Sequence, residues 1–259
     1  FHWNVWAAAL ATCTGMFICT IIAFIPFIKK RALLKFCRPH FTLNMIKQIL
    51  TCGSPNFLNN IAGRITSVLM NFILIRIGGE TAVSVYGILM YADGVIQPLL
   101  YGMCDSLQPA VGYNWGAGKF SRVRAIEKCC FTAAGIVSIL AALVIFLFPE
   151  QISRLFISDI TYEIISVSVI ALKLFSITYI VRWFSFATQS YMLAIENPFS
   201  ASLISVSTAL VFPALLVAVL WPLGLTGIWL NFAGTALLAA ALSAAVLVKQ
   251  RRELYQSDR

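Results

Sequence analysis

The chain has 259 residues, of which 60% are hydrophobic and 11% charged, with a formal net charge of +9. A soluble domain is close to half apolar and a quarter charged, so this composition excludes an ordinary soluble protein and indicates a protein that lies in lipid.

Apolar stretches of membrane length follow one another along the whole chain. A hydrocarbon core of about 30 Å is crossed by about 20 helical residues, and seven stretches reach that length. We therefore predict an all-α polytopic membrane protein with about seven transmembrane helices. The predicted spans are Trp6–Ile28, Pro55–Ile77, Val83–Gly112, Ala125–Phe148, Tyr162–Ala194, Ala201–Leu220 and Gly227–Val248.

The connection after the first span is long and basic. Its amphipathic section at Leu43–Leu50 is expected to form a short helix on the inner membrane surface. We interpret this connection as the joint between two lobes of a longer protein, an interpretation that agrees with a chain opening on Phe1 rather than Met. The predicted divisions are a last helix of one lobe, the joint, a six-helix lobe and a tail, at residues 1–30, 31–53, 54–248 and 249–259.

Basic residues gather in alternate connections, which lie on one side of a membrane. The positive-inside rule places that side, and with it the carboxy terminus, in the cytoplasm. This distribution indicates a topological signal and no nucleic-acid partner. His2 and His40 stand alone, so no metal site is expected. The basic residues are Lys29, Lys30, Arg31, Lys35, Arg38, Lys47, Lys119, Arg122, Arg124, Lys128, Lys249, Arg251, Arg252 and Arg259.

Polar side chains recur at helical spacing inside the second, third and fifth spans. Such stripes avoid lipid and face protein or a water-filled cavity, so we predict that they form the pathway of a substrate or ion. The predicted pathway residues are Asn60, Arg64, Asn71, Asp93, Gln97, Tyr101, Asp105, Gln108, Lys173, Arg182 and Gln189.

Counting from the outer helix ends at 1.5 Å per residue places Asp93 and Lys173 roughly 15 Å deep and Arg182 about 30 Å deep. We therefore expect Asp93 to pair with Lys173 or with Arg64. Lys173 and Arg182 lie on opposite sides of one straight helix and cannot both face a single cavity unless that helix is broken. Two roles for Asp93 stay open, namely an ion-coupling carboxylate and a permanently ionised structural partner.

The order of short motifs resembles the carboxy-terminal lobe of the multidrug and toxic compound extrusion (MATE) family over residues 53–248. The first span is similar to the last helix of that family's amino-terminal lobe. The residues that carry the resemblance are Gly53, Pro55, Gly78, Gly79, Ala82, Val83, Tyr86, Gly87, Gln108, Pro109, Tyr113, Asn114, Gly116, Ala117, Gly118, Arg122, Pro149, Phe156, Asp159, Gln189, Ala194, Gly224, Gly227 and Trp229.

The resemblance implies a two-lobed exporter that exchanges H⁺ or Na⁺ for small organic cations by alternating access, in a cell membrane and without another cofactor. The chain departs from the family at Arg64, because several members carry a carboxylate on that helix. With Arg64, Lys173 and Arg182 present, the lobe also suits anionic solutes. A lipid-linked sugar flippase is the main alternative, ahead of a seven-helix receptor or a membrane-bound enzyme. No clustered acids or nucleophile indicate catalysis.

Overall fold

The computed structural model describes residues 5–29, 42–156 and 162–257, and every regular element in these ranges is a helix. This confirms the prediction of an all-α membrane protein. The helices are α1 (Val5–Ile28), α2 (Leu43–Asp105), α3 (Leu107–Gly116), α4 (Phe120–Leu147), α5 (Pro149–Phe156), α6 (Tyr162–Ala194), α7 (Pro198–Val206), the π-helix η1 (Ser207–Val211), α8 (Phe212–Leu220), the 3₁₀ helix η2 (Trp221–Leu223) and α9 (Gly224–Ser257).

The chain divides into two compact units, Phe1–Ile46 and Lys47–Arg259. The first contains α1, whose large apolar side chains, such as Phe17 and Ile22, are exposed along its length. An apolar helix with no buried face within its own unit requires lipid or protein around it. The second unit contains the candidate site.

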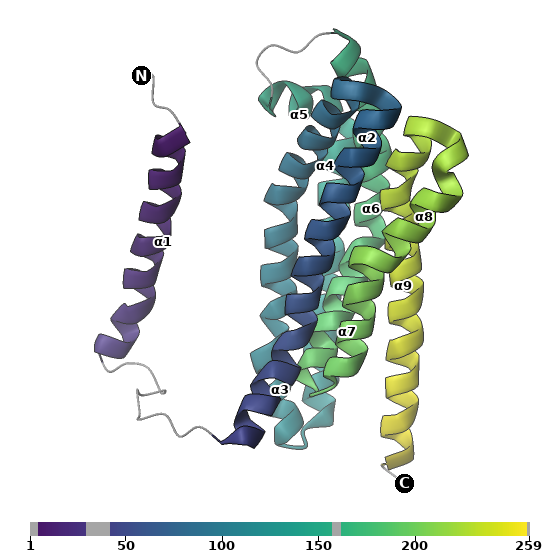
Figure 1. Ribbon diagram of the computed structural model, residues 1–259. Coiled ribbons are helices and arrows are strands. Elements are labelled where there is room, and N and C mark those ends of the chain that lie inside the picture. The colour runs from purple at the N-terminus through teal and green to yellow at the C-terminus, as the bar shows by residue number, and fades with distance from the viewer. Residues whose placement is uncertain (1–4, 30–41, 157–161, 258–259) are drawn as a thin grey trace. The chain divides into compact units, whose positions relative to one another are not determined.

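Glycines fold two long helical runs back on themselves. In the described ranges five runs are long and apolar enough to cross a membrane, and two of them have 74 and 55 residues. About 20 residues suffice for one crossing, so each of these two runs has room for two. The first reverses at Gly79 (φ 62°, ψ −154°) and the second at Gly224 (φ 59°). A side chain is strongly disfavoured at such backbone angles. Figure 1 shows the two legs of α2 that result.

The prediction of a separate surface helix at Leu43–Leu50 is wrong, because α2 begins at Leu43 and runs on through Pro55. Proline lacks the N–H that would bind the carbonyl four residues earlier. Here the Ser54 hydroxyl donates to that carbonyl, on Thr51, at 2.8 Å. The local substitute allows the helix to continue into the membrane-length leg.

Two predicted spans are interrupted. The span Val83–Gly112 divides at Ser106, between α2 and α3. The span Ala201–Leu220 contains η1, in which the Phe212 N–H donates to the Ser207 carbonyl. Pro213 explains this second irregularity, since it cannot bind the carbonyl of Ala209.

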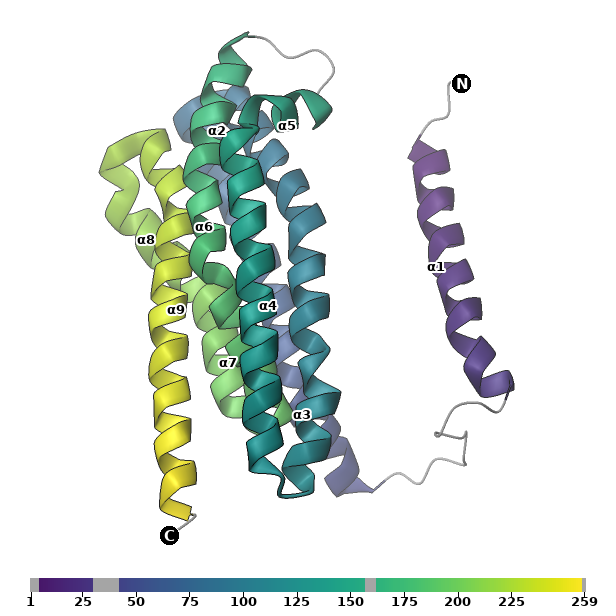
Figure 2. The same ribbon diagram turned by 180° about the vertical axis from the view of Figure 1, so that it is seen from behind.

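The helix α6 lies at the centre of the second unit and packs against α4 and α9 (Figure 2). Phe175 of α6 and Trp229 of α9 belong to its main buried core. At the end where Gly79 turns α2, α5 lies across the bundle. Its Ser153 hydroxyl bonds Ser168 of α6 at 2.8 Å.

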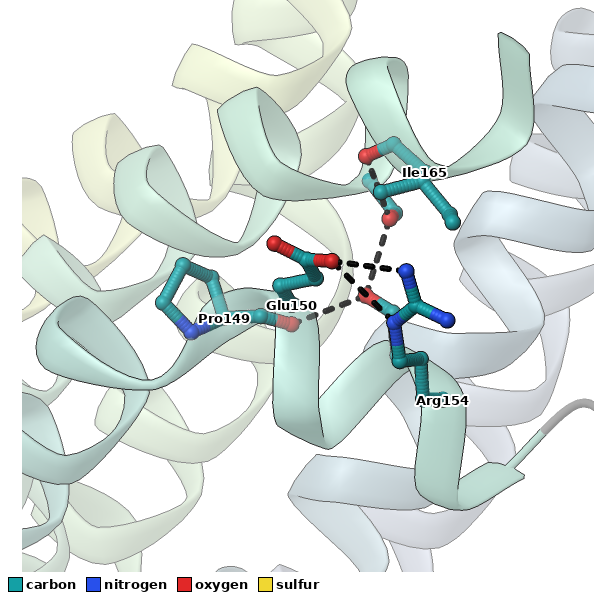
Figure 3. Close-up of polar contacts among 6 residues, drawn as sticks. Pro149, Glu150, Arg154 and Ile165 are labelled. Carbon is teal, nitrogen blue, oxygen red and sulfur yellow. Dashed lines mark hydrogen bonds and ion pairs between the residues drawn. The ribbon is translucent and has the colours of Figure 1, made fainter. Parts of the chain in front are cut away.

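Figure 3 shows the ion pair on α5 between Arg154 and Glu150, whose side chains approach to 2.8 Å near the carbonyls of Pro149 and Ile165. The pair stabilises this short helix only weakly, because both side chains are more than half exposed to solvent.

At the opposite end of the second unit an ion pair between a buried carboxylate and an exposed guanidinium joins α4 to α9. The Glu127 side chain is 4% exposed, and the guanidinium of Arg251 approaches its carboxylate to 2.5 Å. Beside this pair the Asn197 amide donates to Gln250 at 2.9 Å. The helix α9 therefore continues beyond Val248, and its last turns are bound to the bundle.

We expect Gly79→Ala to destabilise the protein by about 1 to 3 kcal/mol, because the positive φ at this turn strains any residue with a Cβ. Thermal unfolding in detergent measures the effect. Gly87→Ala is the matched control, since Gly87 is helical and an added Cβ there meets no atom within 4 Å among the described residues. Equal melting temperatures for the two variants would contradict the assignment of the turn to Gly79.

Candidate functional site

A cavity of about 540 Å³ lies between the two legs of α2, the helix α6, the η1 region and α9. Its volume falls within the roughly 300 to 1,000 Å³ of typical small-molecule sites. Six of the predicted pathway residues line it, drawn from three helical segments that are distant in sequence. These six are Asn60, Arg64, Asp93, Gln97, Tyr101 and Arg182.

Asp93 is the carboxylate of this cavity, and it is paired. It is 7% exposed, and one of its oxygens accepts a hydrogen bond from the Arg182 guanidinium at 2.8 Å. The Tyr179 hydroxyl donates to the same oxygen. Two donors, one of them cationic, stabilise the ionised carboxylate in a place where an unpaired charge is costly. The pair contributes no net charge to the cavity.

Two stacked aromatic rings, those of Phe186 and Tyr101, lie beside Arg182. The guanidinium carbon lies 5.2 Å from the centre of the Phe186 ring, within range of a cation–π interaction. The Tyr101 ring stacks on Phe186 with centroids 4.3 Å apart, and the Tyr101 hydroxyl accepts from the Asn59 amide at 3.1 Å. These contacts hold the Arg182 head in the cavity wall.

The predicted pairing of Asp93 with Lys173 or Arg64 is wrong, because Arg182 is its partner. The error came from measuring depth from the helix ends. The amino-terminal end of α6 extends beyond the turn of α2 at Gly79, so Arg182 lies level with Asp93 (Figures 1 and 2). The prediction that Lys173 and Arg182 cannot share a cavity agrees with the structure. Lys173 is exposed, with its ammonium 5.8 Å from the Phe146 ring centre.

Arg64 lines the cavity from the first leg of α2 and remains exposed. Within the described ranges no ion pair joins it to a carboxylate. Its charge therefore faces the space of the cavity and has no internal partner there.

Neutral polar side chains also line the cavity. The Thr66 hydroxyl donates at 2.5 Å to the Ala209 carbonyl, the group that Pro213 leaves free. Asn231 donates to the Pro213 carbonyl at 3.1 Å and also lines the cavity. Three further hydroxyls of the wall have no hydrogen-bond partner in the described part of the chain: Thr178, Ser185 and Thr208.

The other five predicted pathway residues lie outside this cavity. Asn71 is exposed and donates to the carbonyl of Ser67 on its own helix. Asp105 lies at the end of α2 and accepts hydrogen bonds from Gln108 at 2.9 Å and from Ser190 at 2.7 Å. Its carboxylate therefore has two donors within the protein. Gln189 is buried and Lys173 exposed.

Sequence reasoning missed Tyr179 and Phe186. They lie three residues before and four residues after Arg182, so helical spacing places them beside it. That signal was available, but aromatic residues are common in any apolar span and did not stand out. Thr66 gave no separate signal, because its partner is a carbonyl freed by a proline on another helix.

The described wall of the cavity contains several hydroxyls and one carboxylate. Its hydroxyls lack a neighbouring base, and its carboxylate is engaged by Arg182 and Tyr179. Among the residues that the structure describes, no group of three His, Cys, Asp or Glu side chains is placed to hold a metal.

The family described as MatE matches residues 55–219. Relatives include the multidrug export proteins MepA of Staphylococcus saprophyticus, 24% identical over 97% of this chain, and of Staphylococcus aureus, 24% identical over all of it. The chain spans 56% and 57% of the length of these two relatives.

Solved structures of similar fold include an outward-facing multidrug resistance MATE family transporter of the MOP superfamily (TM-score 0.85, 19% identity). The similarity extends over 97% of this chain and 57% of that transporter. Another is a MOP superfamily transporter from Pyrococcus furiosus, whose description reports a binding pocket of reverse polarity (TM-score 0.85, 18% identity). It covers all of this chain and is covered over 58%.

The pair of Asp93 and Arg182 leads to a prediction about stability. Asp93→Asn and Arg182→Gln should each destabilise the protein, by up to about 3 to 5 kcal/mol, because each leaves an uncompensated charge in the wall. The double variant should lose much less than the sum of the two. Unfolding in detergent measures this cycle, and the same cycle with Lys173→Met in place of Arg182→Gln is the control. Additive losses for Asp93 with Arg182 would contradict the pairing.

Proposed function

The chain belongs to the MATE family of membrane transporters, and we propose that it is part of an exporter of small organic compounds that works by alternating access. In this proposal the cavity along the two legs of α2, α6 and α9 forms part of the substrate pathway. The family resemblance of the sequence and the charged cavity support it together.

The observation that carries the proposal is the position of charged groups inside apolar helices. Arg64, Asp93 and Arg182 meet in one cavity within runs that are otherwise apolar enough to cross a membrane. A charge at this depth is costly, so charges inside spans are characteristic of pathways for solutes and ions.

The proposed organisation has two lobes. Residues 54–248 form the carboxy-terminal lobe, residues 1–30 the last helix of an amino-terminal lobe, residues 31–53 the joint and residues 249–259 a cytoplasmic tail. Support comes from relatives that the chain spans over little more than half of their length. The amphipathic Leu43–Leu50 then forms the beginning of α2 rather than a surface helix. Residues 31–41 of the joint lie outside the described residues.

We propose inward movement of H⁺ or Na⁺ as the driving force, as the family resemblance implies. Of the two roles open to Asp93, its pairing with Arg182 and Tyr179 favours the structural one. In the structural role Asp93 serves as the counter-ion of Arg182. Asp93 then positions Arg182 in the pathway, and the coupling group lies elsewhere.

A lipid-linked sugar flippase fits the cavity less well. Such a protein requires a continuous cationic groove for pyrophosphate. In the described part of the cavity wall the cationic side chains are Arg64 and Arg182, and Asp93 neutralises the second of these.

The orientation can be tested at the two ends of the helix bundle. The turns near Glu80 and Lys119 lie at opposite ends of the second unit (Figure 1) and both residues are exposed. In a background in which the native cysteines are replaced by serine, a membrane-impermeant thiol reagent should label Glu80→Cys only from outside the cell. It should label Lys119→Cys only from the cytoplasmic side. Labelling of both from one side would contradict the proposed crossings.

Transport can be tested in everted vesicles that contain the natural gene product. We expect an acid or sodium-rich lumen to drive uptake of at least one dye from a panel of cationic, neutral and anionic organic dyes. An ionophore that collapses the gradient is the control. Uptake no greater than in vesicles lacking the protein would reject the proposal.

The role of Asp93 is tested by the double variant Asp93→Asn with Arg182→Gln. A structural pair can be removed as a unit, so this variant should keep the ratio of uptake with the gradient to uptake without it. A folded double variant whose uptake no longer responds to the gradient would instead identify Asp93 as the coupling group.

A further inference from the structure

Three charged side chains line the described part of the cavity wall: Arg64, Asp93 and Arg182. The charges of Asp93 and Arg182 neutralise each other, since their charged groups are 2.8 Å apart. The remaining charge is that of Arg64, which has no carboxylate partner among the described residues. This part of the cavity therefore carries a net positive charge.

We infer that this cavity binds the anionic group of an organic substrate at Arg64. The inference rests on the proposed export function and specifies its substrate class, which differs from the organic cation implied by the family resemblance.

The charged side chains of the described wall do not favour a cationic ligand. Among them only Asp93 would attract it, and Arg182 already neutralises that carboxylate. A ligand cation would also meet the unbalanced charge of Arg64, and like charges repel.

An anion fits the same wall. A guanidinium presents parallel N–H donors that match a carboxylate, sulfonate or phosphate. Binding an anion at Arg64 also supplies the partner that the folded chain lacks.

The rest of the wall indicates that the ligand has an apolar, ring-containing body. Tyr86 and Phe232 stack with ring centroids 6.2 Å apart, and Phe175 meets Phe232 edge to face at 5.3 Å. All three residues line the cavity. Aromatic rings favour contact with aromatic or other apolar groups of a ligand. The substrate class is therefore an amphipathic organic anion.

Fluorescence anisotropy on the purified natural gene product in detergent tests the inference with two dyes of similar xanthene body and opposite charge. Carboxyfluorescein is the anionic probe and rhodamine ethyl ester the cationic probe. We expect the wild-type protein to bind carboxyfluorescein more tightly. Arg64→Gln should weaken that binding about 10-fold to 100-fold, the loss expected for a hydrogen bond to a charged group. Arg64→Lys should retain part of this binding, because lysine keeps the positive charge but lacks the paired N–H donors of the guanidinium.

Arg76→Gln is the matched control. It removes the same charge from the same leg of α2, but Arg76 lies over the Phe72 ring, 4.5 Å from its centre, and outside the cavity. Its affinity for carboxyfluorescein should equal that of the wild type. Tighter binding of the cationic dye to the wild type, no binding of carboxyfluorescein, or an equal effect of Arg64→Gln and Arg76→Gln would each overturn the inference. The comparison of dyes on the wild type holds even where a variant fails to fold.

Failure of this inference is distinct from failure of the transport proposal. Gradient-driven uptake of cationic dyes alone, unaffected by Arg64→Gln, would leave export intact and overturn the anionic site. Arg64-dependent binding of carboxyfluorescein without uptake of any dye would support the anionic site and reject export.

Discussion

Lipid cannot satisfy a polar group, and this constraint governs the second unit of the protein. Where a proline leaves a backbone carbonyl without its usual N–H donor, a side-chain hydroxyl donates to that carbonyl instead. Ser54 does so for Thr51 on the same helix, and Thr66 does so for Ala209 on another. Two carboxylates are likewise paired, Asp93 with Arg182 and Glu127 with Arg251. At Pro55 and Pro213 the helical runs continue past a proline with the freed carbonyl bonded to a hydroxyl.

The cavity lies beside one of these bonds, that of the Thr66 hydroxyl with the Ala209 carbonyl. Thr66 both lines the cavity and holds the first leg of α2 to the η1 region, so the irregular backbone of that region is part of the cavity wall. On the other side Asp93 fixes Arg182, with Phe186 and Tyr101 behind it. Arg64 alone among the charged groups of the described wall is left for a ligand. Most of the polarity of the site thus maintains its shape, and one cation remains available for recognition.

The sequence predicted the helices well because lipid imposes a minimum length on every apolar run. It also predicted which face of each helix is polar, and six polar residues duly meet in one cavity. The pairing of Asp93 was not predictable by counting, because α6 extends past the turn of α2 by a length that depends on tertiary packing. The interruption of the helix at η1 was also not predictable from the sequence. Pro213 signals a freed carbonyl, but only the folded structure brings Thr66 to it.

The bond between Glu127 and Arg251 has a practical consequence for handling the protein. Arg251 lies near the end of the sequence, where purification tags are joined and flexible residues are trimmed, yet its partner carboxylate is 4% exposed. Removing Arg251 would take this cation away from Glu127 and remove a bond between α9 and α4. A truncation or tag that alters α9 at Arg251 is therefore expected to loosen this end of the second unit.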